Sequence, residues 1–282
     1  MKVYVVGVGL IGGSFAIDIK AAFKEATVYG IDHDKTHLDE ALKLEIVDHI
    51  ATLSDIKNAD VVIITIPVDS TLAILPEVLD LVSDDGLVFD AGSTKQKLCE
   101  KVRFHPKRRN YLAVHPIAGT EFSGPKAAIA HLYRNKTNII CEVEKTAFKL
   151  QERGMEIFTR LGMRIRYMDP ASHDKHIAYV SHLSHISSFM LGKTVIEKEK
   201  NEKDIFDMAG SGFASTVRLA KSSPAMWAPI FKHNKENVME TLQEYIANLS
   251  HFKKLLEEEE FDKIYREMEA TNRIKSILNG IH

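Results

Sequence analysis

The chain has 282 residues, of which 45% are hydrophobic and 27% are charged, and its formal net charge is -2. This composition is that of a folded protein with room for two domains, and the charge balance excludes bulk attraction to nucleic acid or to an anionic membrane. No segment offers about 18 consecutive apolar residues for a membrane span and the N-terminus lacks a signal-peptide cleavage region, so we expect a soluble, cytoplasmic protein. Cys99 and Cys141 lack metal-ligand spacing and are expected to be buried, reduced thiols.

The first part of the chain alternates β-branched runs with helical stretches, and this order predicts a mostly parallel sheet with crossover helices. We therefore expect an α/β, Rossmann-type domain over residues 1–168. The expected strands are 3–8, 27–32, 60–67, 86–92, 111–115, 137–143 and 163–168. The expected helices are 11–25, 35–44, 70–82 and 95–103, with one more between the last two strands.

From Asp169 the pattern changes to long helical periodicity. Asp169 fits an N-cap position and Pro170 the first helical position, where its missing N–H costs nothing. This predicts an all-α second domain over residues 169–282, whose many apolar residues suit a dimer interface. The run of glutamates at 257–260 is interpreted as a solvated helix face. The expected helices are 170–198, 224–246 and 248–278, broken by the loop AGSGFAS and by Pro224.

A nucleotide site is predicted where the first strand meets the first helix. The motif G-x-G-x-x-G is complete at Gly7, Gly9 and Gly12, and Asp32 ends the second strand about 25 residues past Gly7. The glycines permit the tight turn, a close approach of a pyrophosphate and close helix packing. The Asp32 carboxylate suits ribose hydroxyls and repels a 2'-phosphate, which favours NAD over NADP. The further cofactor contacts expected at this edge are Leu10, Ile11, Ile66 and Pro67.

Three polar clusters fall at strand ends or on helices expected to face that edge: DAGSTK, VHPIAGTEFSG, and HDKHIAYVSHLSH followed by RLAKSSPAMW. On a straight helix His182 and His185 share a face, whereas His173 and His176 lie mostly on other faces, so we expect no metal site. The candidate residues in these clusters are Asp90, Ser93, Lys95, His115, Glu121, His173, His182, His185, Arg218 and Trp227.

Taken in order, GVGLIGGS, DAGSTK, HPIAGTE, SHLSH and RLAKSSPAMW resemble the prephenate dehydrogenase family over nearly the whole chain. The resemblance implies a homodimer that uses NAD to convert prephenate to 4-hydroxyphenylpyruvate by oxidative decarboxylation, in tyrosine biosynthesis. It implies that His115 is the catalytic histidine, that Ser93 is its hydrogen-bonding partner, and that His185 and Arg218 bind substrate. It further matches Glu121 and His173 to gating or supporting positions in the substrate pocket, and Trp227 to a residue that reaches the neighbouring subunit's site.

The expected chemistry suits these residue types. A neutral imidazole with a pKa of about 6.5 can take the proton of the ring hydroxyl, and an arginine fork matches a carboxylate in two hydrogen bonds. Plainer interpretations remain open: an N-cap for Ser93 and a surface ion pair for Arg218. Lys95 is expected to be a solvated charge at a helix start, and His182 a packing residue.

The loop AGSGFASTVRLA departs from the family's usual GGGFxDxTRIA, because Ser215 replaces an acidic residue and Val217 a threonine, which leaves open how Arg218 is braced. Three alternatives compete with prephenate dehydrogenation. Arogenate dehydrogenases use the same site, and His185 favours prephenate over arogenate. β-Hydroxyacid dehydrogenases need a helical lysine with an asparagine, for which no convincing counterpart is found. A non-catalytic NAD-sensing module would leave His115 and Arg218 unexplained.

Overall fold

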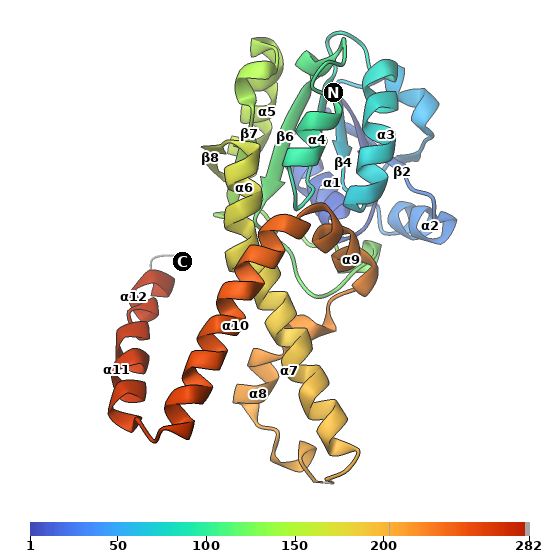
Figure 1. Cartoon of the computed structure of the whole chain (residues 1–282). Coiled ribbons are helices and arrows are strands. Elements are labelled where there is room, and N and C mark those ends of the chain that lie inside the picture. Colours follow the sequence, from blue (N-terminus) through green and yellow to red (C-terminus); the bar gives the residue numbers. More distant parts are fainter. Residues whose placement is uncertain (203, 280–282) are drawn as a thin grey trace. The chain divides into compact units, whose positions relative to one another are not determined.

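A single eight-stranded sheet forms the centre of the α/β part (Figure 1). The computed structural model describes residues 1–202 and 204–279. The strand order is β3-β2-β1-β4-β5-β6-β7-β8, and every neighbouring pair is parallel except β6 and β7. The mostly parallel α/β fold expected from the sequence is thereby confirmed; only the two-residue edge strand β3 was not expected. The strands are β1 (Lys2–Val6), β2 (Thr27–Ile31), β3 (His49–Ile50), β4 (Val61–Ile64), β5 (Leu87–Asp90), β6 (Tyr111–Pro116), β7 (Thr137–Cys141) and β8 (Arg164–Met168).

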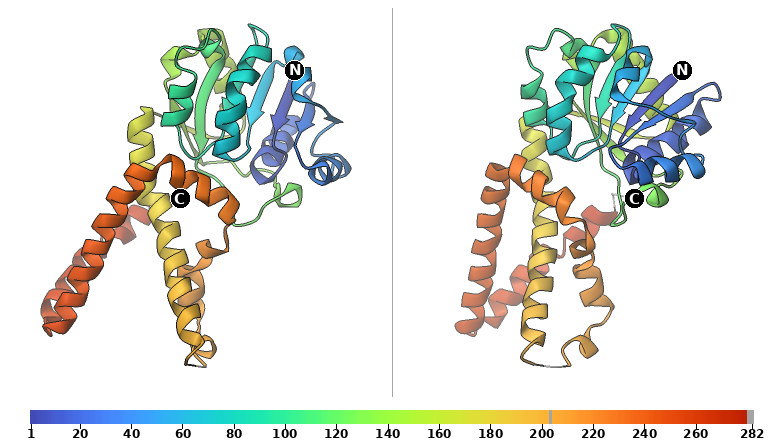
Figure 2. Two further views of the ribbon diagram at one scale, coloured as in Figure 1. Left: turned by 45° about the vertical axis from the view of Figure 1, so that its right-hand side comes forward. Right: turned by 90° about the vertical axis from the view of Figure 1, so that its right-hand side faces the viewer.

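Helices cover both faces of this sheet, as Figure 2 shows from two directions. Successive strand residues point to opposite faces, so Val5 and Phe89 enter one apolar core while Val6 and Val88 enter the other. The sheet is therefore buried on both sides, and ligands can reach it only at strand ends. The first core contains α1 (Leu10–Ala22), α2 (Lys35–Lys43) and α5 (Phe148–Arg160), and the second contains α3 (Val68–Leu81) and α4 (Gln96–Lys101).

The helix predicted over 170–198 is present. α6 (Pro170–Ile177) begins as expected, with the Asp169 carboxylate accepting a hydrogen bond from the Ser172 N–H at 2.9 Å. A π-helical turn over Ala178–His182 then joins it to α7 (Leu183–Glu199). Such a widened turn shifts the angular positions of the residues that follow it, which an expectation based on a straight α-helix does not include.

The later helix boundaries were predicted wrongly. α9 (Pro224–His233) has Asn234 as its C-cap residue, and α10 (Lys235–Glu257) runs through the break expected at 247. The glutamate run at 257–260 is not a helix face, because α10 ends at Glu257 and Glu259 has a φ of +55°, a value typical of a turn. Periodicity alone did not locate these breaks, since the apolar spacing continues across them. The remaining helices are α8 (Ser211–Thr216), inside the segment expected to be a loop, α11 (Phe261–Thr271) and α12 (Ile274–Asn279).

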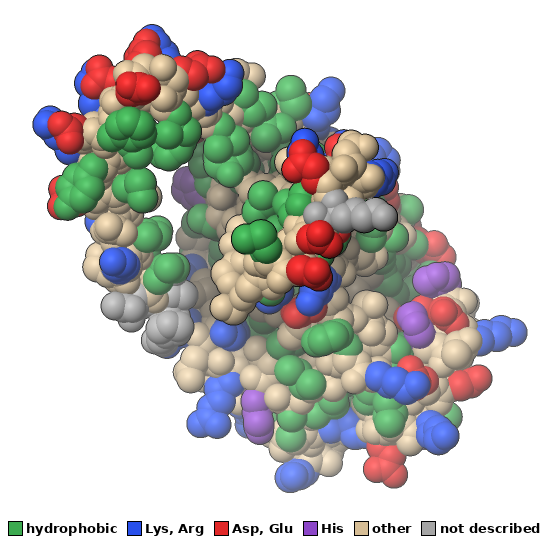
Figure 3. Space-filling model, turned by 90° about the horizontal axis from the view of Figure 1, so that it is seen from below, with side chains coloured by type: hydrophobic (Ala, Val, Ile, Leu, Met, Phe, Trp, Pro, Cys, Tyr) green, Lys and Arg blue, Asp and Glu red, His purple; other side chains and the backbone are tan. Residues whose placement is uncertain are grey.

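The chain divides into two compact units, Met1–Lys235 and Glu236–His282. Within the second unit an ion pair between His251 Nε2 and Glu267 Oε1, at 2.8 Å, joins α10 to α11. Among the described residues, no helix is both long and apolar enough to cross a membrane. Hydrophobic side chains are nevertheless abundant on the surface of the helical part, as Figure 3 shows from below. In the second unit the exposed ones are Met239, Ile246, Leu249, Phe252, Leu256, Phe261, Tyr265, Met268, Ile274, Ile277 and Leu278.

Candidate active site

The glycine turn between β1 and α1 is built by backbone constraints. Gly7 has a φ of +95°, a conformation that favours glycine. A methyl group at Gly12 would overlap the Gly7 carbonyl oxygen and lie 2.8 Å from a Val5 methyl carbon, so only glycine lets α1 start here. Gly9 differs, because a methyl group there would meet nothing nearer than the Gly124 nitrogen at 3.9 Å. The protein itself does not require glycine at this position, and the space beside Gly9 is open to a ligand.

Asp32 follows β2 at the same edge. Its Oδ2 accepts a hydrogen bond from the Val8 N–H and its Oδ1 accepts one from the Asp34 N–H, both at 3.0 Å. These bonds hold the carboxylate beside the glycine turn, and each oxygen keeps capacity for a further donor. The exposed His33 imidazole lies 3.1 Å from Oδ1. The carboxylate is thus placed to accept hydrogen bonds from sugar hydroxyls.

The segment after β4 completes this part of the edge. The Thr65 hydroxyl donates to the Gly7 carbonyl oxygen at 2.6 Å, which ties the end of β4 to the glycine turn. Ile66 packs against Gly7, and Pro67 is the N-cap residue of α3. Of the other two cofactor candidates, Leu10 is buried at the start of α1 and Ile11 is half-buried beside it. All the predicted cofactor residues therefore lie in or next to the glycine turn, except Asp32, which reaches it through Val8.

The loop after β6 is bound to α1. The Ile129 N–H donates to the Ser14 hydroxyl at 3.0 Å, and the His131 N–H donates to the Asp18 carboxylate at 2.8 Å. The Tyr133 ring stacks on Phe15, with ring centroids 4.1 Å apart. These contacts hold the segment that follows β6 against α1, the helix that begins at the glycine turn.

His115 is the last residue but one of β6 and is 8% exposed. Its Nδ1 lies 2.8 Å from Nε2 of His173, and Nδ1 of His173 lies 2.7 Å from Oδ1 of Asp174. Burial lowers the pKa of His115 well below its ordinary value, and electrostatic interactions with His173, Lys95 and His182 act in the same direction. The imidazole is therefore held in its neutral form at neutral pH. His173 is only 1% exposed, so it contacts His115 from the protein interior.

Lys95 is fully buried, and the expectation of a solvated charge was wrong. Its ammonium pairs with the Asp90 carboxylate and donates to the Val114 carbonyl oxygen at 2.7 Å, while the Tyr111 hydroxyl donates to Asp90 at 2.7 Å. These partners compensate the positive charge, which explains how a lysine can be fully buried beside β6. The sequence offered no signal for this beyond the spacing of Asp90 and Lys95.

Asp174 was also missed from the sequence. Its two carboxylate oxygens accept hydrogen bonds from the backbone N–H groups of Lys95, at 2.7 Å, and Gln96, at 3.0 Å. Asp174 on α6 therefore caps the first turn of α4, and Ser93 does not, because α4 has Lys95 as its N-cap residue. Ser93 is half-buried in the turn between β5 and α4, beside the end of the strand that pairs with β6.

Four of the five predicted substrate residues form two contacting pairs, and the fifth, His173, lies against His115. The His185 ring stacks on Trp227 of the same chain, with centroids 3.5 Å apart, and its Nδ1 lies 2.9 Å from the Ser181 carbonyl oxygen. Burial lowers the pKa of His185, and the charge of Arg218 contributes to this shift. The guanidinium of Arg218 is 53% exposed and lies 3.5 Å from the Glu121 carboxylate.

His182 is buried, as expected of a packing residue, and its ring lies edge-on to Trp227. Its Nδ1 lies 3.2 Å from Nδ2 of Asn234, at the end of α9. Burial lowers the pKa of His182 to about 4. Within the described residues, no group of three or more histidine, cysteine, aspartate or glutamate side chains could hold a metal ion. Both cysteines are buried free thiols, as expected.

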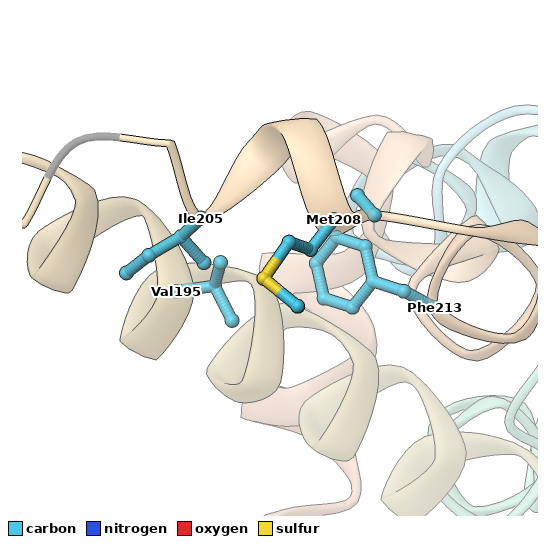
Figure 4. A pocket seen from close by; sticks show the side chains of 5 residues that line it. Val195, Ile205, Met208 and Phe213 are labelled. Carbon is cyan, nitrogen blue, oxygen red and sulfur yellow. The ribbon is translucent and has the colours of Figure 1, made fainter.

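A separate apolar pocket lies in the helical part of the first unit (Figure 4). It contains none of the predicted site residues and offers no charged side chain for chemistry. It is lined by Val195, Ile205, Met208, Ala209 and Phe213.

Comparisons with known proteins agree on one family. The family model described as prephenate dehydrogenase, nucleotide-binding domain, matches residues 15–167. The model described as prephenate dehydrogenase, dimerization domain, matches residues 169–270. A prephenate dehydrogenase of Bacillus subtilis is 32% identical over 264 residues, covering 92% of this chain and 71% of the relative. A cyclohexadienyl dehydrogenase of Zymomonas mobilis is 25% identical over 281 residues, covering 99% and 96%.

Solved structures agree with this result. The crystal structure of prephenate dehydrogenase from Aquifex aeolicus, in complex with hydroxyphenyl propionate and NAD+, has a TM-score of 0.88 and 30% identity, covering 99% of this chain and 98% of that one. Synechocystis arogenate dehydrogenase has a TM-score of 0.78 and 25% identity, covering 99% and 100%. From its sequence, its fold and the arrangement of its strand-end residues, the chain belongs to the prephenate dehydrogenase family.

Proposed function

We propose that this chain is an NAD-dependent dehydrogenase that converts prephenate to 4-hydroxyphenylpyruvate by oxidative decarboxylation. The observation that carries the proposal is the buried, neutral His115 at the sheet edge that also bears the glycine turn. Membership of the prephenate dehydrogenase family supports the same reaction class. In this proposal residues 1–168 bind the cofactor and residues 169–282 supply substrate-binding residues.

The glycine turn and Asp32 fit NAD. The open space at Gly9 suits the pyrophosphate, and the free N–H groups at the start of α1 point to the same place. The Asp32 carboxylate accepts the ribose hydroxyls and repels a 2'-phosphate, which favours NAD over NADP. The chemistry that bound NAD would supply at this site is that of a hydride acceptor for the ring carbon.

His115 accepts the proton of the ring hydroxyl as that carbon is oxidised. A neutral imidazole is required for this step, and the lowered pKa of His115 keeps it neutral. Ser93, in the turn after the neighbouring strand, holds the hydroxyl in line by a hydrogen bond. Loss of carbon dioxide is driven by aromatisation of the ring and needs no separate acid, so positioning is the main task of the protein.

Arg218 and His185 bind the substrate carboxylates. The half-exposed guanidinium is 3.5 Å from Glu121, longer than a good charge-assisted hydrogen bond, so a substrate carboxylate can compete for it. Trp227 holds the His185 ring by stacking. Arogenate is the alternative substrate, since the Glu121 carboxylate beside the pocket residues would suit its ammonium group; one solved relative is described as an arogenate dehydrogenase.

Two copies of the chain form a dimer through the helical part. The exposed apolar side chains of α10, α11 and α12 and the apolar pocket in Figure 4 are surfaces that a second copy would cover. The family model that matches 169–270 is described as a dimerization domain. Sedimentation velocity at assay concentrations is expected to give a dimer, and a monomer that turns over at full rate would contradict this.

The reaction is tested by following NADH absorbance with purified protein, NAD and either prephenate or arogenate, beside a His115→Asn variant. Rapid reduction with prephenate that collapses in the variant supports the proposal. Reduction only with arogenate keeps the mechanism and changes the substrate. NAD binding without turnover of either acid would refute the enzyme and leave a binding module.

A further inference from the structure

We infer that His173 and Asp174 are positioning residues that fix the tautomer of His115, so that its Nδ1 carries the proton and its Nε2 is left as the acceptor. The inference rests on the proposed function for its catalytic consequence, because it explains how His115 is prepared to take a proton. The tautomer itself can be measured without any reaction.

The chain of contacts begins at Asp174. Both of its carboxylate oxygens accept backbone N–H groups at the start of α4, from Lys95 and Gln96, which holds the group as a hydrogen-bond acceptor. The same Oδ1 lies 2.7 Å from Nδ1 of His173. The proton in that contact therefore belongs to His173, whose Nδ1 donates.

The remaining protons follow from the chemistry of neutral imidazole. With its proton on Nδ1, His173 presents a lone pair at Nε2, which lies 2.8 Å from Nδ1 of His115. His115 must then donate through Nδ1 and keep a lone pair on Nε2. The opposite arrangement would put N–H protons on both ring nitrogens of His173, and so a second positive charge in a buried cluster that already holds the Lys95 ammonium.

The surroundings keep this arrangement in place. His173 and Asp174 are 1% and 2% exposed, so water does not compete for their hydrogen bonds. The Asn234 amide donates to the Asp174 backbone carbonyl at 2.6 Å, which anchors α6 to the end of α9. Asp174 thus has two tasks, since one carboxylate caps α4 and orients His173. A histidine in the wrong tautomer offers an N–H to the substrate hydroxyl, and such an error costs on the order of 10²- to 10⁴-fold in rate in other enzymes.

The direct test is ¹⁵N NMR of substrate-free protein labelled with ¹⁵N-histidine, with His115 assigned by the signal lost in His115→Asn. We expect the His115 Nδ1 to show the shift of a protonated nitrogen and Nε2 that of an unprotonated one. The reverse pattern, or two protonated nitrogens at neutral pH, would overturn the inference. Since no substrate is present, the result stands apart from the identity of the substrate. A protein with this tautomer and no turnover would refute the proposed function only.

A pair of variants tests the consequence for rate. His173→Gln places an amide oxygen near the position of Nε2 and keeps an acceptor for His115, whereas His173→Leu removes it. We expect His173→Leu to lower kcat about 100-fold with KM changed less than about threefold, and His173→Gln to recover at least about tenfold of that loss. NAD binding by fluorescence confirms that each variant is folded. Equal kcat in both folded variants would contradict the inference.

Discussion

The two halves of the candidate site are stabilised by different kinds of interaction. In the cofactor corner, formed by Gly7, Gly9, Gly12 and Asp32, the backbone at Gly7 and Gly12 is packed so closely that no added atom fits there. The histidine corner is built from buried side chains that come from β5, β6, α6 and the N-cap position of α4, and these side chains compensate one another's charges and hydrogen-bonding groups. Substitutions in the cofactor corner should therefore destabilise the protein by steric overlap. Substitutions in the histidine corner should destabilise it by leaving a buried polar group without a partner.

The largest effect is expected at the histidine corner from Lys95→Met, which leaves the buried Asp90 carboxylate without its cation. Breaking a buried ion pair from one side costs about 3–5 kcal/mol of unfolding free energy. Urea unfolding measures it. The double variant Lys95→Met, Asp90→Asn removes both charges and should recover part of the loss. A single variant as stable as the wild type would show that the pair contributes nothing.

The cofactor corner is tested by Gly12→Ala, with Gly9→Ala as its matched control. The added methyl at Gly12 overlaps the Gly7 carbonyl oxygen, so we expect a loss of about 3 kcal/mol in stability and much weaker NAD binding. At Gly9 the methyl meets nothing within 3.9 Å, so stability should stay unchanged while NAD affinity falls. Differential scanning calorimetry measures the stability of each variant, and isothermal titration calorimetry measures its affinity for NAD. An unchanged NAD affinity in Gly9→Ala would mean that the pyrophosphate does not pass there.

Arg218→Lys tests a predicted substrate-binding residue that lies outside both corners. The variant keeps the positive charge and loses the planar fork, so we expect KM for prephenate to rise about 10- to 100-fold with a smaller change in kcat. Lys221→Ala is the control, because it removes another cation from the same 3-10 turn, Arg218–Lys221. An unchanged KM in Arg218→Lys, together with a raised KM in Lys221→Ala, would indicate general attraction of the anionic substrate and no specific fork.

The smallest expected effect is a shift in pH dependence. His115 acts as a base only when neutral, and burial places its pKa well below 6.5. The kcat/KM for the substrate should therefore stay level as the pH falls through about 6.5, and decline only at lower pH. An ordinary exposed histidine would lose half of its activity near that value. A decline centred at about 6.5 or above would show that His115 is not held neutral by its surroundings.

A related stability change follows for His182, whose pKa is lowered to about 4 in the folded protein. The unfolded chain binds this proton at about pH 6.5, so the unfolded state gains protons first as the pH falls. Folding stability should decrease from pH 6.5 toward about 4 through this group. Urea unfolding at several pH values, compared with His182→Gln, measures the slope, and an identical slope in the variant would exclude His182 as its source.

The geometry of the cofactor corner follows from sequence signals that are local. The glycine motif, the strand before it and Asp32 all lie within one β-α-β stretch, and the Asp169 cap of α6 depends on a contact three residues away. The histidine corner was only partly predictable. The bond from Lys95 to Asp174 spans 79 residues, and neither side chain carries a pattern that separates burial from solvation.

The helix boundaries illustrate a second reason for failure. The end of α9 at Asn234 was placed too late, since apolar residues recur at helical spacing on both sides of it. The π-helical turn Ala178–His182 has no sequence signature of its own, so the relative positions of His173, His182 and His185 could not be computed from a 100° step. Both features depend on packing between elements that are distant in the chain.

The contacts between α1 and the loop after β6 also constrain how the protein is made. The Ser14 hydroxyl is bonded to the N–H of Ile129, a residue 115 positions later. At a synthesis rate of about 5–20 residues per second, the helix that follows the glycine turn waits roughly 6 to 23 seconds for this partner. During that interval Phe15 lacks the Tyr133 ring that covers it in the finished protein. Until Tyr133 has been synthesised, the nascent N-terminal segment therefore exposes an apolar surface that a chaperone can bind.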